Sequence, residues 1–178
     1  MKYLYPLIIL LIFFSSCEER ESIPKEDKDK YSGELGPDQI AWDVNVVFVD
    51  SSFTKAILKA RRARVYNGPM ETLLDSGLKV DFFSRESGAR ISHLTADSAR
   101  IDDRTKNMLA RGNVVVISDS SARKLETSVL SWDNKTQKFY SSEFVKITSP
   151  DEVIQGYGLE SDVQLSKYKI LGVSGEKR

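Results

Sequence analysis

The one cysteine of the chain, Cys17, lies at an abrupt change in composition. An uninterrupted apolar run at residues 7–14 comes before it, separated only by Ser15 and Ser16, and the charged residues 18–21 follow. A single cysteine can form no disulfide within the chain, and the paired-cysteine and Cys/His spacings of metal sites are absent from the sequence. The chemistry that this position offers is therefore that of a lone nucleophilic thiol.

The segment before Cys17 has the features of an export signal. Lys2 is followed by an apolar run of about a dozen residues, shorter than the roughly 20 that a transmembrane helix needs. Ser15, Ser16 and Cys17 resemble a bacterial lipobox, in which the thiol is acylated and the chain is cut just before the cysteine. This resemblance implies a signal peptide at 1–16 and lipidation at Cys17. The alternative is an ordinary signal peptide or an uncleaved anchor with an incidental cysteine, and under each interpretation the rest leaves the cytoplasm.

Other reactive side chains do not form a catalytic set. His93 is the only histidine, and no serine, cysteine or carboxylate motif flanks it as a triad or metal site would require. Asp102, Asp103 and Asp133 lie in turn-forming sequences, where aspartate serves backbone geometry. The sequence thus predicts neither an enzyme nor a metal or cofactor site.

Two basic runs, at 59–64 and 85–93, are candidates for binding an anionic headgroup. Their candidate residues are Arg61, Arg62, Arg85 and Arg90. The alternative is a solvated charged face, which is the commoner explanation of such runs. The whole chain has 26 basic and 26 acidic residues, so its surface offers no general attraction for nucleic acid.

The length of 178 residues is that of one ordinary domain. Residues 17–38 are charged and poor in aliphatic side chains, which predicts a lipidated N-terminus and a flexible tether. The folded domain is expected to span 39–178. Short runs rich in valine, isoleucine and phenylalanine alternate there with turn signals, which predicts an all-β fold. Residues 53–68 are ambiguous because of their alanines, and we interpret them as a strand.

An internal repeat predicts how these strands are arranged. A shift of 31 residues superposes 94–118 on 125–149, and each copy reads as a strand, a polar turn and a returning strand. A third copy begins at residue 158, with Leu159 placed in the role of Leu125. Repeated hairpins bury their apolar faces by stacking, which predicts an open, twisted β-roll.

The repeat also predicts which side chains face the interior. Val115 superposes on Lys146, which must face solvent, so the residues on either side of each face inward. The candidates for an apolar groove are Val80, Phe82, Val114, Val116, Val145 and Ile147. Each of them could equally be ordinary core.

The order of these pieces resembles the LptC family of lipopolysaccharide-export proteins. The residues that carry the resemblance are the strand at 94–99, the turn at 102–105, "ARGNVVV" at 110–116, "LET" through "FVKIT" at 125–148, and the closing segment at 156–175. The resemblance implies a β-jellyroll slab related to the LptA and OstA folds. It also implies a non-enzymatic domain on the periplasmic side of the inner membrane. Such a domain accepts lipopolysaccharide from an ABC transporter and passes it to an LptA-like bridge protein by edge-strand pairing.

The two end strands are the candidates for those contacts. Residues 42–49 are the candidate for docking near the transporter, and 168–175 the candidate for pairing with the bridge protein. The alternative function is a lipid-anchored structural or adhesive β-protein of the cell envelope that binds a protein or a glycan.

Overall fold

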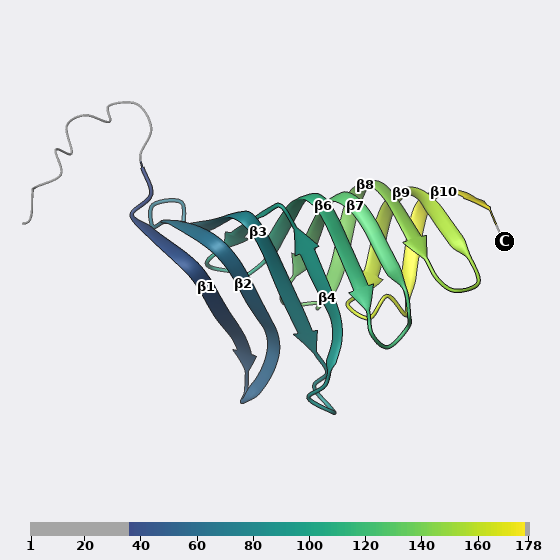
Figure 1. Ribbon diagram of the computed structural model, residues 1–178, viewed down its shortest axis with the longest axis horizontal. Helices are drawn as coiled ribbons and strands as arrows, with labels where there is room; N and C mark the ends of the chain where they lie inside the picture. Colours follow the sequence, from purple (N-terminus) through teal and green to yellow (C-terminus); the bar gives the residue numbers. More distant parts are fainter. Residues whose placement is uncertain (1–35, 177–178) are drawn as a thin grey trace, which may run out of the picture. The chain divides into compact units, whose positions relative to one another are not determined.

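The structure is a computed structural model that describes residues 36–176. These residues form one antiparallel sheet of ten strands (Figure 1). The strands are β1 (Gln39–Asp50), β2 (Phe53–Tyr66), β3 (Glu71–Phe83), β4 (Arg90–Ala96), β5 (Ser98–Asp102), β6 (Met108–Ser118), β7 (Lys124–Asp133), β8 (Lys138–Thr148), β9 (Val153–Asp162) and β10 (Tyr168–Glu176).

The sheet is a meander in which neighbours in sequence are neighbours in space. Its order is β1-β2-β3-β4-β6-β7-β8-β9-β10, and β5 continues β4 beyond Asp97, so that both lie between β3 and β6. The predicted all-β fold of stacked antiparallel hairpins is confirmed. Within the described residues, β1 and β10 each pair with one strand only, so the sheet is open and has two free edges.

Most strands contain an irregularity near their middle, and these irregularities define a line across the sheet. At Asp97 the main-chain carbonyl accepts a hydrogen bond from the Gly77 amide (3.0 Å), and the Asp97 amide donates to the Gly112 carbonyl (3.0 Å). The Asn113 side chain then donates to the Asp97 carboxylate (2.8 Å). Gly112 has φ +76°, and a Cβ there would lie 2.4 Å from Oδ2 of Asp97. Bulges of this kind bend a strand and increase its twist.

The bulges fold the sheet over on itself, as the arching ribbons of Figure 1 show. We call the two halves layer A and layer B, and each long strand contributes to both. Layer A contains 44–60, 78–96, 114–127, 144–157 and 172–176, and layer B contains 39–42, 62–75, 98–111, 129–141 and 159–170.

The core lies between the two layers. Phe82 of layer A contacts Trp132 and Phe139 of layer B, with ring centroids 5.5 Å and 5.4 Å apart in edge-to-face geometry. Phe48 contacts Trp132 in the same way at 6.1 Å. Such pairs contribute about 0.5–1.5 kcal/mol each beyond the burial of their area. The aromatic side chains therefore fix the spacing of the layers.

Burial confirms the predicted alternation. Val114, Val116, Val145 and Ile147 are at most 1% exposed, whereas Lys146 is exposed. Residues 53–66 are a strand, as interpreted, because Ala56, Leu58 and Ala60 all face the core.

The placement of Leu159 in the third repeat is wrong. The Asp162 carboxylate accepts the Ser166 amide at 2.8 Å, just as Asp133 accepts the Thr136 amide at 2.7 Å, so these two aspartates are equivalent. Counting back from them makes Leu159 the equivalent of Leu130 in layer B. Leu125 lies in layer A, on the other side of the bulges.

Candidate functional site

An apolar groove opens between the layers at the β1 end of the sheet. Its volume is about 340 Å³, within the range of about 300–1,000 Å³ usual for ligand sites. The lining residues are Val44, Val46, Val47, Phe48 and Val49 of β1, Leu58 and Ala63 of β2, Thr72 and Leu74 of β3, Ile101 of β5, and Asp103 and Lys106 of the following turn.

The groove is open because β1 is an edge strand. Val46 is paired with Leu58 and shares its face of the sheet, yet Val46 is 37% exposed and Leu58 is 1% exposed. Leu74 and Ile101 of layer B form the opposite wall and are buried. The groove thus has a buried apolar floor and an accessible apolar lip, which suits a flexible hydrocarbon chain.

The rim of the groove is polar on its layer B side. The Thr72 hydroxyl donates to Oδ2 of Asp103 at 2.9 Å, and Nζ of Lys106 lies 3.5 Å from Oδ1 of the same carboxylate. An ammonium group paired with a carboxylate therefore stands at the mouth of a mainly apolar groove.

Hydrogen bonds hold the layers together on the side away from the bulges. Beside the groove, Nζ of Lys55 donates to the Asn134 carbonyl at 3.4 Å. Farther along, the Ser121 hydroxyl donates to the Gln164 carbonyl at 2.8 Å, and Nη1 of Arg123 donates to the Leu165 carbonyl at 3.0 Å. The Leu165 side chain is fully buried. One hydrogen bond therefore joins the layers beside the groove, and two more join them toward β10.

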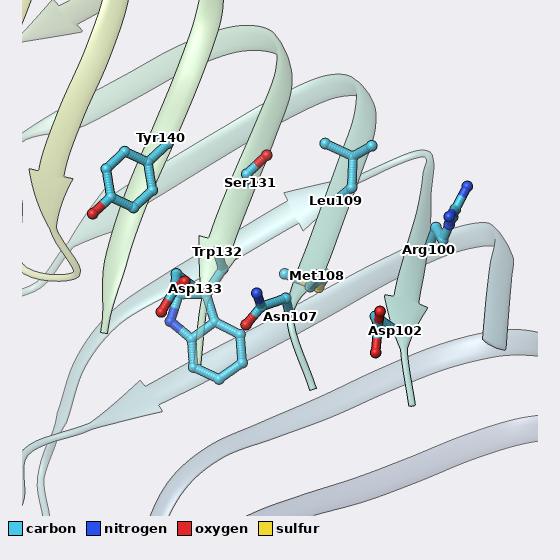
Figure 2. Close-up of a pocket in the computed structure, with 9 residues that line it drawn as sticks. All are labelled: Arg100, Asp102, Asn107, Met108, Leu109, Ser131, Trp132, Asp133 and Tyr140. Carbon is cyan, nitrogen blue, oxygen red and sulfur yellow. The ribbon is translucent and has the colours of Figure 1, made fainter. Parts of the chain in front are cut away.

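A second cavity, of about 390 Å³, lies at the turns of layer B and is shown in Figure 2. Asn107 stands between Asp102 and Asp133, and its Oδ1 accepts the Asn134 amide at 2.9 Å. Backbone amides of their own turns donate to both aspartates and hold the pKa of each carboxyl below its usual value. These carboxylates accept hydrogen bonds within their own turns, which is the structural role that the sequence predicted.

The six predicted groove residues face inward but do not line the open groove. Val80, Phe82, Val114, Val116, Val145 and Ile147 are each 0–2% exposed and belong to the closed core. Contact between them and a lipid stays a prediction. The residues at the actual opening include those of β1, which were predicted to dock near the transporter rather than to line a groove. Leu58, Leu74 and Ile101 were not among the predicted groove residues. The alternation of Ala56, Leu58 and Ala60 was the signal that could have found Leu58.

The four candidate headgroup arginines do not form one site. Arg62 bonds to Asp75, and this hydrogen bond lowers the pKa of the Asp75 carboxyl. Arg90 bonds to Asp119 at 2.7 Å and likewise lowers the pKa of that carboxyl. Arg85 is exposed in the β3–β4 turn. Arg61 lines a separate basic pocket on the outer surface.

Both end strands carry exposed apolar side chains. At β1, Ile40 and Trp42 are more than half exposed, and Arg62 stacks over the Trp42 ring at 5.5 Å. At the other edge Leu171 is 71% exposed, and Phe144 and Tyr157 make an edge-to-face pair at 5.5 Å on the outer face of the sheet. Residues 42–49 and 168–175, the two predicted contact segments, thus belong to the two free edges.

Cys17 and the tether to residue 35 lie outside the described residues. Nowhere in residues 36–176 is there a helix with the length and apolarity to cross a bilayer.

Comparison with known proteins shows the family to which this chain belongs. The model of the family described as lipopolysaccharide-assembly, LptC-related, matches residues 4–176. A search of curated proteins finds no match to the chain. This family is a non-enzymatic component of lipopolysaccharide transport in the cell envelope. Because the match covers nearly the whole sequence, and the open antiparallel sheet agrees with it, the chain belongs to the LptC-related family of lipopolysaccharide assembly.

Proposed function

We propose that this protein carries the acyl chains of lipopolysaccharide in the space between its two layers, and that the chains enter at the groove beside β1. The observation that carries the proposal is the apolar groove itself, with Val46 and Phe48 at its lip and Leu58 and Leu74 below. An acyl chain gains roughly 0.8 kcal/mol for each methylene that it buries, with little dependence on the exact side chains. A groove of this kind suits a lipid whose chains vary.

Passage beyond the groove requires the layers to separate. The bonds that oppose separation include those of Lys55 with Asn134, Ser121 with Gln164, and Arg123 with Leu165. Each contributes about 1 kcal/mol net, so three are offset by roughly four buried methylenes. A long acyl chain can therefore offset the loss of these three hydrogen bonds while its methylenes take over apolar contacts between the layers, and the six buried groove candidates would then line its path.

The two free edges provide the proposed points of transfer. In this proposal β1 lies toward the inner-membrane ABC transporter, and β10 adds to the sheet of an LptA-like bridge protein. Strand addition satisfies unpaired main-chain groups at an edge, and neighbouring apolar side chains add specificity. Leu171 on β10, with Phe144 and Tyr157 nearby on the outer face, offers such side chains.

The N-terminal segment is the proposed anchor. Lipidation of Cys17 would hold the domain at a membrane surface, with the inner membrane favoured by the transporter partner. Several acyl chains give stable attachment, whereas a single chain is marginal.

The test is photo-crosslinking in cells that make lipopolysaccharide. A photoreactive residue is placed at Val46 in the groove lip, at Val116 in the core, and at Val115, whose side chain faces outward, as the matched control. We expect lipopolysaccharide adducts at Val46 and Val116 that depend on ATP hydrolysis by the transporter, and none at Val115.

The second candidate function is that of a structural envelope protein that docks on a partner and carries no lipid. The exposed pair of Phe144 and Tyr157 is the observation that favours it. Absence of adducts at both Val46 and Val116, in a folded and exported protein, would overturn lipid transport in favour of this alternative.

A further inference from the structure

A basic pocket of about 420 Å³ lies on the outer surface near the β1 edge, at the line of bulges. Its charged residues are Lys59 and Arg61 of β2, Lys79 of β3 and Asp43 of β1. The remaining lining residues are Val44, Asn45, Ala60, Ser76, Gly77 and Leu78. The pocket therefore has three cations and one carboxylate.

The cations of this pocket are poorly neutralised. Lys59 and Lys79 are directly opposite each other on neighbouring strands, an arrangement that destabilises a sheet when the charges are alike. Lys79 lies 3.3 Å from Asp81, but Asp81 also pairs with Arg90. Within residues 36–176, neither Lys59 nor Arg61 has an acidic partner within 4.0 Å. An anion placed over these side chains would reduce a repulsion that Asp81 compensates only in part.

The backbone is irregular at this shallow surface pocket. Asp43, Ser76 and Gly77 all have positive φ (50°, 65° and 90°), because β1 and β3 are irregular where they pass the bulge line. Asn45 is opposite Lys59 on β1, so an amide side chain borders the lysine pair. The pocket thus combines two ammonium groups, a guanidinium and an amide, all of which can donate hydrogen bonds to oxyanions.

We propose that this pocket binds a phosphate group. Phosphate suits it because its several acceptor oxygens can each take a charge-assisted hydrogen bond. The strand β1 separates the pocket from the apolar groove, and Val44 lines both cavities. A phosphorylated amphiphile at this edge could therefore place its phosphate on the outer face and its chains inside. The phosphate site does not depend on lipid transport, since it can be tested with a soluble anion.

The experiment is a titration of the full chain in neutral detergent micelles, followed by the amide chemical shifts of Lys59, Gly77 and Lys79. The first probe is inorganic pyrophosphate, and the second is phosphatidic acid added to the micelles, with phosphatidylcholine as its neutral control. The test variant is K59Q/K79Q. The matched control is K146Q, which removes an exposed lysine from the same outer face of layer A.

We expect saturable shifts with pyrophosphate and an increase of about fivefold or more in apparent Kd for K59Q/K79Q, because two charge-assisted contacts are lost. K146Q should stay within about twofold of the parent protein. Tighter binding of phosphatidic acid than of pyrophosphate would identify a lipid headgroup as the source of the phosphate, and equal binding would identify a free phosphate.

We expect K59Q/K79Q to stay folded, so unfolding should not account for a change in its apparent Kd. Removing two opposed lysines relieves repulsion, so the unfolding midpoint of K59Q/K79Q should be unchanged or slightly raised at low salt. Absence of saturable shifts, an unchanged Kd in K59Q/K79Q, or an equal loss in K146Q would each overturn the proposal. The last result would show only general attraction to a charged surface.

Discussion

The rings of Phe82 and Trp132 meet across the two layers of the sheet, with centroids 5.5 Å apart and planes inclined by 61°. Phe82 is 1% exposed and Trp132 is 2% exposed, and Phe139 of layer B also packs against Phe82. These three aromatic side chains therefore form one buried contact between the two layers.

We expect Phe82→Ala to lower the free energy of unfolding by about 3–5 kcal/mol, because the substitution leaves a cavity between the layers. Urea denaturation followed by tryptophan fluorescence measures this loss. The control is Phe144→Ala, which removes a 42% exposed ring and should cost less than about 1.5 kcal/mol. Equal losses for the two variants would contradict the central role of Phe82.

Trp132→Phe should be far milder than Trp132→Ala. The indole Nε1 of Trp132 is buried and has no hydrogen-bond partner in the structure. An unsatisfied buried donor costs about 1–3 kcal/mol, so its removal offsets part of the lost ring volume while the contact with Phe82 is kept. Thermal unfolding of the two variants checks this. A phenylalanine variant as unstable as the alanine variant would show that the indole ring volume is what matters.

Gly112→Ala should destabilise the protein for two reasons, a positive φ and a clash with Asp97. Gly77 has φ +90° and open space around it, and Gly68 has neither constraint, so these glycines separate the two causes. We expect Gly112→Ala to cost about 1–3 kcal/mol or more, Gly77→Ala about 1 kcal/mol, and Gly68→Ala little or nothing. Denaturant midpoints of the three variants measure the order, and a different order would show that another contact limits the bend.

We expect the free energy of unfolding to fall at acid pH because Asp102 and Asp133, in the turns, become protonated. Asp102 and Asp133 have a pKa below the ordinary value of 3.8 because backbone amides donate to their carboxylates. A carboxyl whose pKa is lowered on folding contributes stability above its unfolded pKa, and this contribution disappears as the pH falls through the folded pKa. Unfolding free energy should thus hold from neutral pH to about 5 and decline below about 4.

The variant Asp133→Asn tests the assignment. It should be less stable than the parent protein at pH 7 and should lose less stability on acidification. Asp151→Asn, which alters an exposed carboxylate in the β8–β9 turn, is the control and should follow the parent curve. Parallel curves for the parent protein and Asp133→Asn would exclude this aspartate as a source of the acid sensitivity.

The repeat in the sequence was sufficient to predict the hairpins and the inward faces of β6 and β8. Lys146 indicated which residues face inward, because a lysine that faces the core is costly. The repeat superposes Val115 on Lys146, so Val115 is also expected to face outward. The error at Leu159 arose because the third copy was aligned by its first leucine, whereas the turn aspartates are what repeat in space. Sequence could not locate the open groove, since Val46 and Val116 have the same local alternation. Only the opposite layer, which covers one and not the other, distinguishes them.

The two free edges also determine how copies of the molecule can associate. The β1 and β10 strands differ in sequence and lie at opposite ends of the strand order. A contact that joins β10 of one molecule to β1 of the next is heterologous, and such contacts form rows unless a rotation closes them into a ring. The sheet therefore has a direction, from a first strand to a last, and a chain of such modules would have a direction too.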